Sequence, residues 1–428
     1  MGPESEQITK WPMMLLFAAI FCAYAGLPSR SAAQTLAVAP ALAPGSSGDT
    51  TADAVLGQVD FVHTTKDFVD GRGVNLSVMQ PLSLVKYGDV AIDKSISPNR
   101  VYVADDGNSR VLGWSSINAF VTHAAADIVI GQPDFNSNLC NNNGGPTAAS
   151  LCFPKSVAVD GAGRLYVADL GNNRVTEYNA PFTTDRVADD VFGQIGLFNA
   201  NYCNMSQSIT PGPPDSDTLC QPTGVGADSA GNIYVADSRN NRVLEFNTPE
   251  VITAVIGSGD TSADRVFGQL GDFTTSTSNK GGLGSSSLSG PQGVGIDSAG
   301  NVYIADTGNN RVTEYDTPLT KDTVADRAFG QFGFGNAACN KGGAVSASSL
   351  CTPVRVAIDS VKSVYVADLG NNRVVEYDSA PTLCTANSGP CAKRVFGQAG
   401  SLAKALCNDG GVSASSLCTP AGIAVDGA

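Results

Sequence analysis

One ten-residue string recurs five times along this chain and restricts the folds that the chain can adopt. Its pattern is Y-(V/I)-A-D-x-x-N-(N/S)-R-V, and its aspartates, at steps of 64, 68, 69 and 62 residues, are Asp105, Asp169, Asp237, Asp306 and Asp368. Self-similarity at a nearly constant period indicates a repeat architecture, in which many similar units build one composite surface.

Each repeat contains four short segments typical of β-strands. In the third unit these segments are 222–228, 233–237, 242–247 and 264–269, and Gly, Asn, Asp or Ser residues separate them. Short β-branched and aromatic runs between such residues indicate strands joined by tight turns. No segment after residue 45 has a sustained helical period. Four antiparallel strands in each of five or six units predict an all-β fold, a β-propeller.

The repeated residues also resemble a known family. The combined pattern P-x-G-V-A-V-D-x-x-G-N-x-Y-V-A-D-x-x-N-N-R-V resembles the NHL repeat over roughly residues 53–428. The resemblance implies a six-bladed propeller of four-stranded blades. Its known relatives include extracellular sensor domains, protein- and RNA-binding scaffolds, and some lyases and hydrolases, so the fold alone does not select a function.

The strand patterns predict that the last blade is incomplete. We call the four strands of a blade A to D in chain order. The A-type and D-type strings each occur six times, whereas strands B and C occur five times. The first D-type string, 52–58, precedes any A-type string and is expected to close the ring by joining the last blade. We therefore expect residues 51–428 to form the propeller and a longer gene product to complete its sixth blade.

The N-terminal region resembles an export signal. Lys10 precedes an apolar stretch, and small residues suitable for cleavage follow it. We predict a signal peptide over 1–33 and a flexible lead-in over 34–50; the alternative is an uncleaved membrane anchor. Cleavage would leave no stable membrane span and place the protein outside the cell or in the periplasm or cell envelope.

The overall charge argues against one class of partner. The formal net charge is −14, and no basic stripe is visible in the sequence. Nucleic-acid surfaces require such a stripe, so we expect no nucleic acid to bind. The remaining candidate partners are a protein, a glycan or a small anionic ligand.

The cysteines fall into local couples, which supports export. Four couples lie between a D-type string and the next A-type string, and where one member is absent the other is absent too. Joint absence is expected of paired residues; the alternative is a metal site assembled from separate loops. We predict disulfides in an oxidising compartment that join Cys140 with Cys152, Cys203 with Cys220, Cys339 with Cys351, Cys384 with Cys391, and Cys407 with Cys418.

Strand direction shows which loops share a face. The B–C turns and the D–A connections lie at one end of the ring; we call this end the loop-bearing rim. Each B–C turn carries the repeated Asp and an Arg, and a feature present in every blade is expected to be structural, with a calcium or ligand role as the alternative. The arginines are Arg110, Arg174, Arg242, Arg311 and Arg373.

Positions that differ between blades are better candidates for ligand binding. The residues after each strand-A proline should lie near the mouth of the central channel, at the loop-bearing rim. Lys155, Thr223, Gln292 and Arg355 would form a partly cationic ring there, without a carboxylate. Such a ring would suit an anionic or carbohydrate-like ligand, or it would merely solvate the channel mouth.

Two functions remain open from the sequence. The first is a binding scaffold that acts through the loop-bearing rim. The second is an enzyme that resembles the six-bladed lactonases and lyases, with a metal in the channel. Only His63 and His123 are available as histidine ligands or bases, and no G-x-S-x-G elbow is present. We therefore assign no catalytic residue, metal ligand or cofactor and favour the scaffold.

Overall fold

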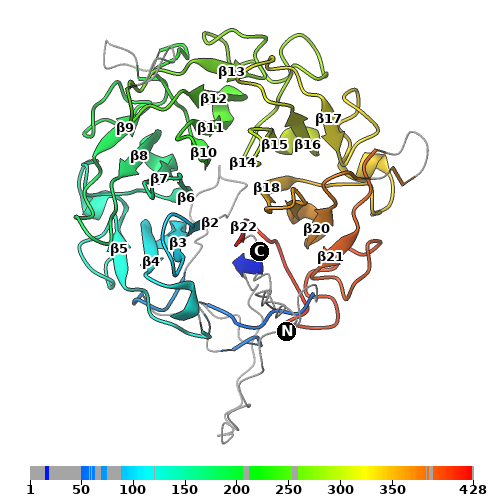
Figure 1. Cartoon of the computed structure of the whole chain (residues 1–428), viewed down its shortest axis with the longest axis horizontal. Helices are drawn as coiled ribbons and strands as arrows, with labels where there is room; N and C mark the ends of the chain where they lie inside the picture. The colour runs from blue at the N-terminus through cyan, green and yellow to red at the C-terminus, as the bar shows by residue number, and fades with distance from the viewer. Residues whose placement is uncertain are drawn as a thin grey trace, which may run out of the picture.

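The computed structural model describes residues 15–18, 50–56, 58, 60–62, 69–74, 88–119, 121–205, 212–252, 259–381, 383–384 and 389–426. Five four-stranded antiparallel sheets are arranged around a central axis (Figure 1). The prediction of an all-β propeller with four-stranded blades is confirmed. The first two blades are β2 (Val90–Asp93), β3 (Arg100–Asp105), β4 (Arg110–Trp114) and β5 (Ile128–Ile130), then β6 (Pro154–Val159), β7 (Leu165–Asp169), β8 (Arg174–Tyr178) and β9 (Asp190–Phe192).

The other three complete blades repeat this order. Blade 3 consists of β10 (Pro222–Ala227), β11 (Ile233–Asp237), β12 (Arg242–Phe246) and β13 (Arg265–Phe267). Blade 4 consists of β14 (Gly293–Ile296), β15 (Val302–Asp306), β16 (Arg311–Tyr315) and β17 (Arg327–Phe329). Blade 5 consists of β18 (Pro353–Ile358), β19 (Val364–Asp368), β20 (Arg373–Tyr377) and β21 (Arg394–Phe396).

The described residues form five complete blades, and two described strands lie at the sixth place. Here β22 (Gly422–Val425) contacts β18 and β2, and pairs antiparallel with β1 (Leu15–Ala18). The prediction that the string 52–58 supplies a strand is wrong for its described residues, which form no strand although the Ala52 amide donates to the Ala414 carbonyl (2.9 Å). In the complete blades strand D pairs with strand C, and the sixth place has no strand C among the described residues.

The repeated D-x-x-N-N-R string forms one kind of turn. Each B–C turn is a single 3-10 turn followed by a residue in the left-handed region, such as Asn241 with φ 53°. Asparagine tolerates this conformation because its short polar side chain bonds locally. The turns are η1 (Asp106–Asn108), η4 (Leu170–Asn172), η5 (Ser238–Asn240), η6 (Thr307–Asn309) and η8 (Leu369–Asn371); the connections contain η2 (Ile117–Ala119), η3 (Cys140–Asn143) and η7 (Cys339–Gly342).

The core lies between the blades. Strand D of one blade packs its phenylalanine edge-to-face on an aromatic residue of strand C in the next blade. The ring centroids are 5.2 Å apart for Phe192–Phe246 and 5.0 Å apart for Phe267–Tyr315. Such pairs contribute about 0.5–1.5 kcal/mol beyond the burial of their area. Because neighbouring blades cover both faces of a blade, apolar residues follow one another along its strands instead of alternating with polar ones.

The innermost strands surround the channel (Figure 1). A cavity of about 180 Å³ is lined by residues of β2, β6, β10, β14, β18 and β22. Its walls along the strands are mainly aliphatic, with Asp89, Ser156 and Arg355 near the start of the innermost strands and Lys94 after the end of β2. The residues predicted to face the channel mouth therefore lie in, or directly before, strands that line this cavity.

All five predicted disulfides form, which confirms that prediction. Four of them close a D–A connection on the loop-bearing rim, and the fifth closes a short loop between β20 and β21. The bonded pairs are Cys140 with Cys152, Cys203 with Cys220, Cys339 with Cys351, Cys384 with Cys391, and Cys407 with Cys418. These cysteines are therefore bonded to one another and do not form the alternative metal site.

The D–A connection between blades 3 and 4 has no disulfide. Between blades 3 and 4, Ser278 and Ser289 take the places of the two cysteines, and the Ser278 hydroxyl donates to the Ser289 hydroxyl (2.8 Å). A hydrogen bond there replaces the covalent link.

We predict that the double substitution Ser278→Cys and Ser289→Cys forms a sixth disulfide. The two positions match those of the cysteines in the other connections, so oxidation should raise the free energy of unfolding by about 2–3 kcal/mol. Thiol titration and denaturant unfolding, with and without reductant, measure this. Two free thiols under oxidising conditions, or no loss of stability on reduction, would contradict the prediction.

Candidate functional site

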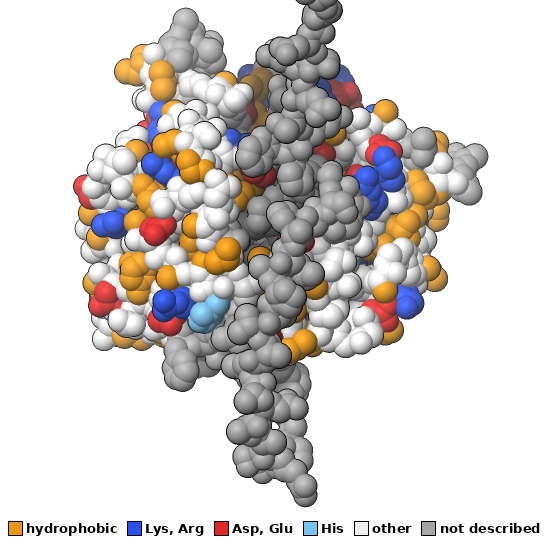
Figure 2. Space-filling view, turned by 60° about the horizontal axis from the view of Figure 1, so that its bottom comes forward, with side chains coloured by type: hydrophobic (Ala, Val, Ile, Leu, Met, Phe, Trp, Pro, Cys, Tyr) orange, Lys and Arg blue, Asp and Glu red, His pale blue; other side chains and the backbone are white. Residues whose placement is uncertain are grey.

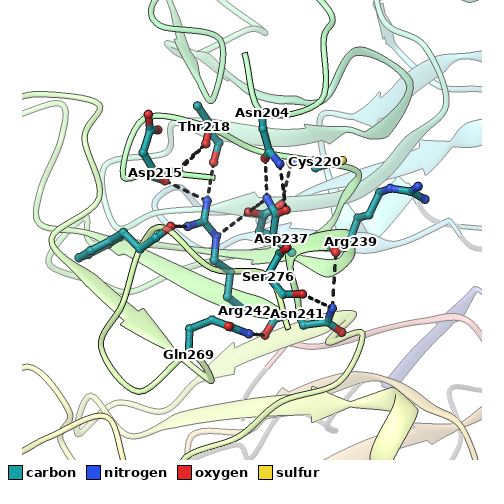
Figure 3. Close-up of polar contacts among 12 residues, drawn as sticks. Asn204, Asp215, Thr218, Cys220, Asp237, Arg239, Asn241, Arg242, Gln269 and Ser276 are labelled. Carbon is teal, nitrogen blue, oxygen red and sulfur yellow. Dashed lines mark hydrogen bonds and ion pairs between the residues drawn. The ribbon is translucent and has the colours of Figure 1, made fainter. Parts of the chain in front are cut away.

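A buried ion pair joins each B–C turn to the loops around it, and Figure 3 shows the pair of blade 3. Arg242 in blade 3 donates from Nε to Asp237 Oδ2 (2.8 Å). Its Nη1 donates to the Phe273 carbonyl (2.5 Å), and its Nη2 donates to the carbonyls of Asp215 (2.9 Å) and Thr218 (2.8 Å). One guanidinium therefore holds its own turn, the preceding D–A connection and the following one.

The carboxylate of the pair is equally engaged (Figure 3). Asp237 Oδ1 accepts the Cys220 amide (2.7 Å), and Oδ2 accepts the Asn240 side-chain amide (2.7 Å). Asn240 in turn exchanges hydrogen bonds with Asn204 of the disulfide loop. Burial raises the pKa of Asp237, although the positive charge of Arg242 acts in the opposite direction.

The same arrangement occurs in all five blades. The Nε–Oδ2 distances are between 2.7 and 2.9 Å, and both side chains of every pair have no exposed area. Four protein acceptors surround each arginine, which is the arrangement of a structural cross-link. The pairs are Asp105–Arg110, Asp169–Arg174, Asp237–Arg242, Asp306–Arg311 and Asp368–Arg373.

A repeated glutamine also fixes the rim loops, and the sequence analysis did not identify this role. Gln194 donates from Nε2 to the Asn173 carbonyl (2.8 Å) and the Tyr202 carbonyl (2.9 Å). The glutamine that ends each D-type string makes equivalent contacts in the other blades. The sequence signal was present, because these glutamines recur with the repeat: Gln132, Gln194, Gln269, Gln331 and Gln398.

The D–A connections, which the arginine and the glutamine hold in place, expose apolar side chains to solvent. In three of the four disulfide-bearing D–A connections the residue before the first cysteine is Leu139, Tyr202 or Leu406, with exposed fractions of 57%, 48% and 61%. In the fourth it is Ala338. Leu270 and Phe332, which follow the glutamine in two other connections, are also exposed. The carbonyls of Leu139, Tyr202 and Leu406 are held by the glutamine, so their positions are fixed while their side chains point outward.

The four predicted mouth residues meet at one end of the channel. Arg355 extends across it, and its Nη2 donates to the carbonyls of Lys155 (2.7 Å) and Thr223 (2.8 Å). Its Nη1 donates to the Gln292 carbonyl (2.8 Å). All four residues are buried. Arg355 therefore connects the innermost strands of blades 2 to 5 rather than standing open to a ligand.

The prediction that this mouth has no carboxylate is wrong. Asp89 Oδ2 lies 2.9 Å from Arg355 Nε and accepts the Ser156 hydroxyl (2.6 Å), and Asp106 pairs with Lys155. Asp89 precedes β2, and Asp106 lies in a B–C turn, so neither occupies one of the two positions directly after a strand-A proline. Burial raises the pKa of Asp89, and it raises that of Asp106 to about 6, although the charge of Lys155 opposes this.

Other elements of the predicted site remain separate. His123 lies in the β4–β5 connection, at the end of the ring opposite the mouth, and His63 lies outside the described residues. No three His, Cys, Asp or Glu side chains converge closely enough to hold a metal ion within the described ranges. Acidic and basic side chains are interspersed on the face shown in Figure 2. No helix within the described ranges could cross a membrane.

The fold and the turns define a β-propeller in which the same buried aspartate–arginine pair links the turn of every complete blade to its neighbouring loops. The NHL-repeat family model matches residues 151–178, 219–246 and 288–315, which are strands A to C of blades 2 to 4. The chain therefore contains NHL repeats, and these repeats form blades of a β-propeller.

Two curated proteins are similar over part of their length. The chloroplastic protein SUPPRESSOR OF QUENCHING 1 of Arabidopsis thaliana is 25% identical over 215 residues, which are 50% of this chain and 18% of that protein. Teneurin-1 of Homo sapiens is 24% identical over 330 residues, which are 74% of this chain and 11% of that protein. The chain thus spans less than a fifth of either relative.

Two solved structures have a similar architecture. A chain of a nidogen/laminin complex has a TM-score of 0.42 and 14% identity, with 78% of this chain and 84% of that chain covered. Virginiamycin B lyase from Staphylococcus aureus has a TM-score of 0.36 and 12% identity, with 70% and 71% covered.

We predict a pH effect from Asp106. Its pKa is about 6 in the folded chain against an ordinary 3.8, so its contribution to stability is greatest below pH 4 and is lost as the pH rises through 6. Between pH 4 and pH 8 the wild type should therefore lose more free energy of unfolding than Asp106→Asn, by on the order of 2 kcal/mol.

Denaturant unfolding across this range measures the difference. Asp185→Asn, at an exposed position in the β8–β9 connection, serves as the control. Equal pH slopes for the wild type and Asp106→Asn would contradict the prediction.

Proposed function

We propose that this propeller is a binding scaffold that acts outside the cytoplasm and contacts a protein partner through its loop-bearing rim. The observation that carries the proposal is the set of exposed apolar side chains on clamped loops. Leu139, Tyr202 and Leu406 occupy equivalent positions in three D–A connections, and each follows the same pattern of glutamine and disulfide restraint. Exposed apolar side chains on a surface favour contact with a partner.

Restraint of the loops also favours binding. Ordering a loop on association costs free energy, and a loop held in advance by covalent and polar links avoids much of that cost. The D–A connections are held by the arginine, the glutamine and, in four cases, a disulfide. This supports the rim as the contact surface, because the strands themselves are covered by neighbouring blades.

The compartment and the class of partner follow from two further features. Disulfides persist in oxidising environments, so five of them support a location outside the cytoplasm. A small anionic ligand at the channel mouth is less well supported, because the cations of Lys155 and Arg355 are already paired with Asp106 and Asp89. A protein that covers the apolar rim residues fits these charges better.

The test compares two triple variants of the mature chain. Leu139→Asp, Tyr202→Asp and Leu406→Asp change the loop-bearing rim, whereas Ile96→Asp, Val324→Asp and Val361→Asp place the same charges on exposed residues of the opposite end. A partner is first identified by cross-linking in the native extracytoplasmic fraction, and its affinity for each purified variant is then measured by biolayer interferometry.

We expect the rim variant to bind at least about tenfold more weakly and the opposite-end variant to bind like the wild type, since charge disrupts apolar contact only where contact is made. Circular dichroism and unfolding should show that both variants are folded. Equal losses in both, or an unchanged affinity of the rim variant, would refute the rim as the contact surface.

A further inference from the structure

A glutamate–arginine pair recurs on the two outer strands of three blades. Strand C carries a buried glutamate, and the directly opposite residue of strand D is an arginine. The N–O distances are 2.9, 2.7 and 3.3 Å for Glu245–Arg265, Glu314–Arg327 and Glu376–Arg394. A buried carboxylate requires such a partner, because an uncompensated buried charge is costly.

Blade 2 reverses the charge of the partner. The residue opposite Glu177 is Asp190 rather than an arginine. Glu177 has no exposed area, and neither of its carboxylate oxygens has a hydrogen-bond partner among the described residues. Asp190 accepts from the Val191 amide of its own strand (2.6 Å). Two acidic side chains on neighbouring strands thus occupy the place of an ion pair.

Blade 3 adds a third acidic residue at the same place. In blade 3, Arg265 donates from Nη2 to the carbonyl of Leu319, which belongs to the next blade (3.1 Å). Glu250 is the residue equivalent to Leu319 in the repeat, and it stands in the same relation to blade 2. The Glu250 carboxylate is half-buried, and its Oε1 has no partner in the described structure.

The available protein cation does not neutralise this cluster. The positive charge of Arg164 acts on Glu177, but Arg164 is itself paired with Asp160 (2.6 Å). Burial, together with the neighbouring carboxylates, raises the pKa of Glu177 to about 8 and that of Glu250 to about 7. Near neutral pH these carboxyls therefore tend to hold their protons, and a cation bound among them would stabilise their ionised forms.

The place is reachable from solvent. In blade 3 the corresponding Arg265 side chain keeps 29% of its area exposed, so a guanidinium seated there reaches the surface. At the equivalent place beside blade 2, Asp190 of blade 2 and Glu250 of blade 3 are half-buried, and Asp189 next to Asp190 is exposed. The cluster opens on the outer edge of the ring between blades 2 and 3, toward the end opposite the loop-bearing rim.

We propose that the acidic cluster of Glu177, Asp190 and Glu250 binds an arginine side chain supplied by a protein partner. Its guanidinium would lie between blades 2 and 3 as that of Arg265 lies between blades 3 and 4. Arginine suits this place because its planar group bonds a carboxylate and a further acceptor together, as Arg265 does with Glu245 and Asn247. Asn179, the equivalent of Asn247, is present in blade 2.

The experiment uses N-acetylarginine amide as the probe and N-acetylcitrulline amide as its neutral isostere, at pH 8.5, where the glutamates are ionised. Isothermal titration compares the wild-type mature chain with Asp190→Arg, which supplies the arginine from strand D as blade 3 does. Asp322→Arg places the same charge on an exposed residue of the β16–β17 connection and is the matched control. Glu177→Gln is a second variant of the site.

We expect the wild type and Asp322→Arg to bind the arginine probe, and citrulline to bind at least about tenfold more weakly. Asp190→Arg and Glu177→Gln should each lose about tenfold or more in affinity, and Asp190→Arg should unfold at the same temperature as the wild type or at a higher one. Undiminished binding by both site variants, equal binding of citrulline, or no binding of the arginine probe would overturn the proposal. Displacement of the probe by calcium chloride at equimolar concentration would also overturn it, in favour of a metal site. None of these outcomes bears on the loop-bearing rim.

Discussion

Every complete blade depends on one buried ion pair, between the aspartate that ends strand B and the arginine that begins strand C. The pair has no exposed area, so its desolvation is costly, and its attraction alone gives little net stability. Its effect is directional: the five donors of the arginine and the two oxygens of the aspartate connect a turn to two loops that are far away in sequence. Removing one partner of such a pair costs about 3–5 kcal/mol, because the other charge remains buried.

These pairs explain why one end of the ring differs from the other. The carbonyls and amides of the D–A connections are used by the arginine, the aspartate and the repeated glutamine, so long loops become fixed surfaces. Residues that vary between the blades are therefore presented by loops whose backbone is held in the same way in each blade. Tyr202 on the loop-bearing rim and Asp190 on the outer edge are examples, and both proposed binding surfaces consist of such varied positions.

The periodic features of the fold could be predicted from the sequence, whereas contacts between blades could not. Strand order and the pairing of Cys203 with Cys220 follow from local patterns repeated along the chain. The reach of Arg355 to the Lys155 carbonyl spans 200 residues, and no local pattern shows it. The acid Asp89 was missed for the same reason. The string 52–58 was predicted as a strand because its residues match the pattern, but the described residues form no strand C beside it.

Hydrogen–deuterium exchange on the wild type and Arg311→Met tests the central claim most directly. The connection between blades 3 and 4 has no disulfide, so its protection depends on Arg311, which holds the carbonyls of Gly284 and Ser287, and on the Asp306 carboxylate that accepts the Ser289 amide. The account predicts that segment 279–289 exchanges slowly in the wild type and that Arg311→Met loses protection there and around Phe334, with blade 2 unchanged. The account would be contradicted if segment 279–289 of the wild type exchanged as fast as the 316–326 connection. It would also be contradicted if Arg311→Met showed no local change in exchange.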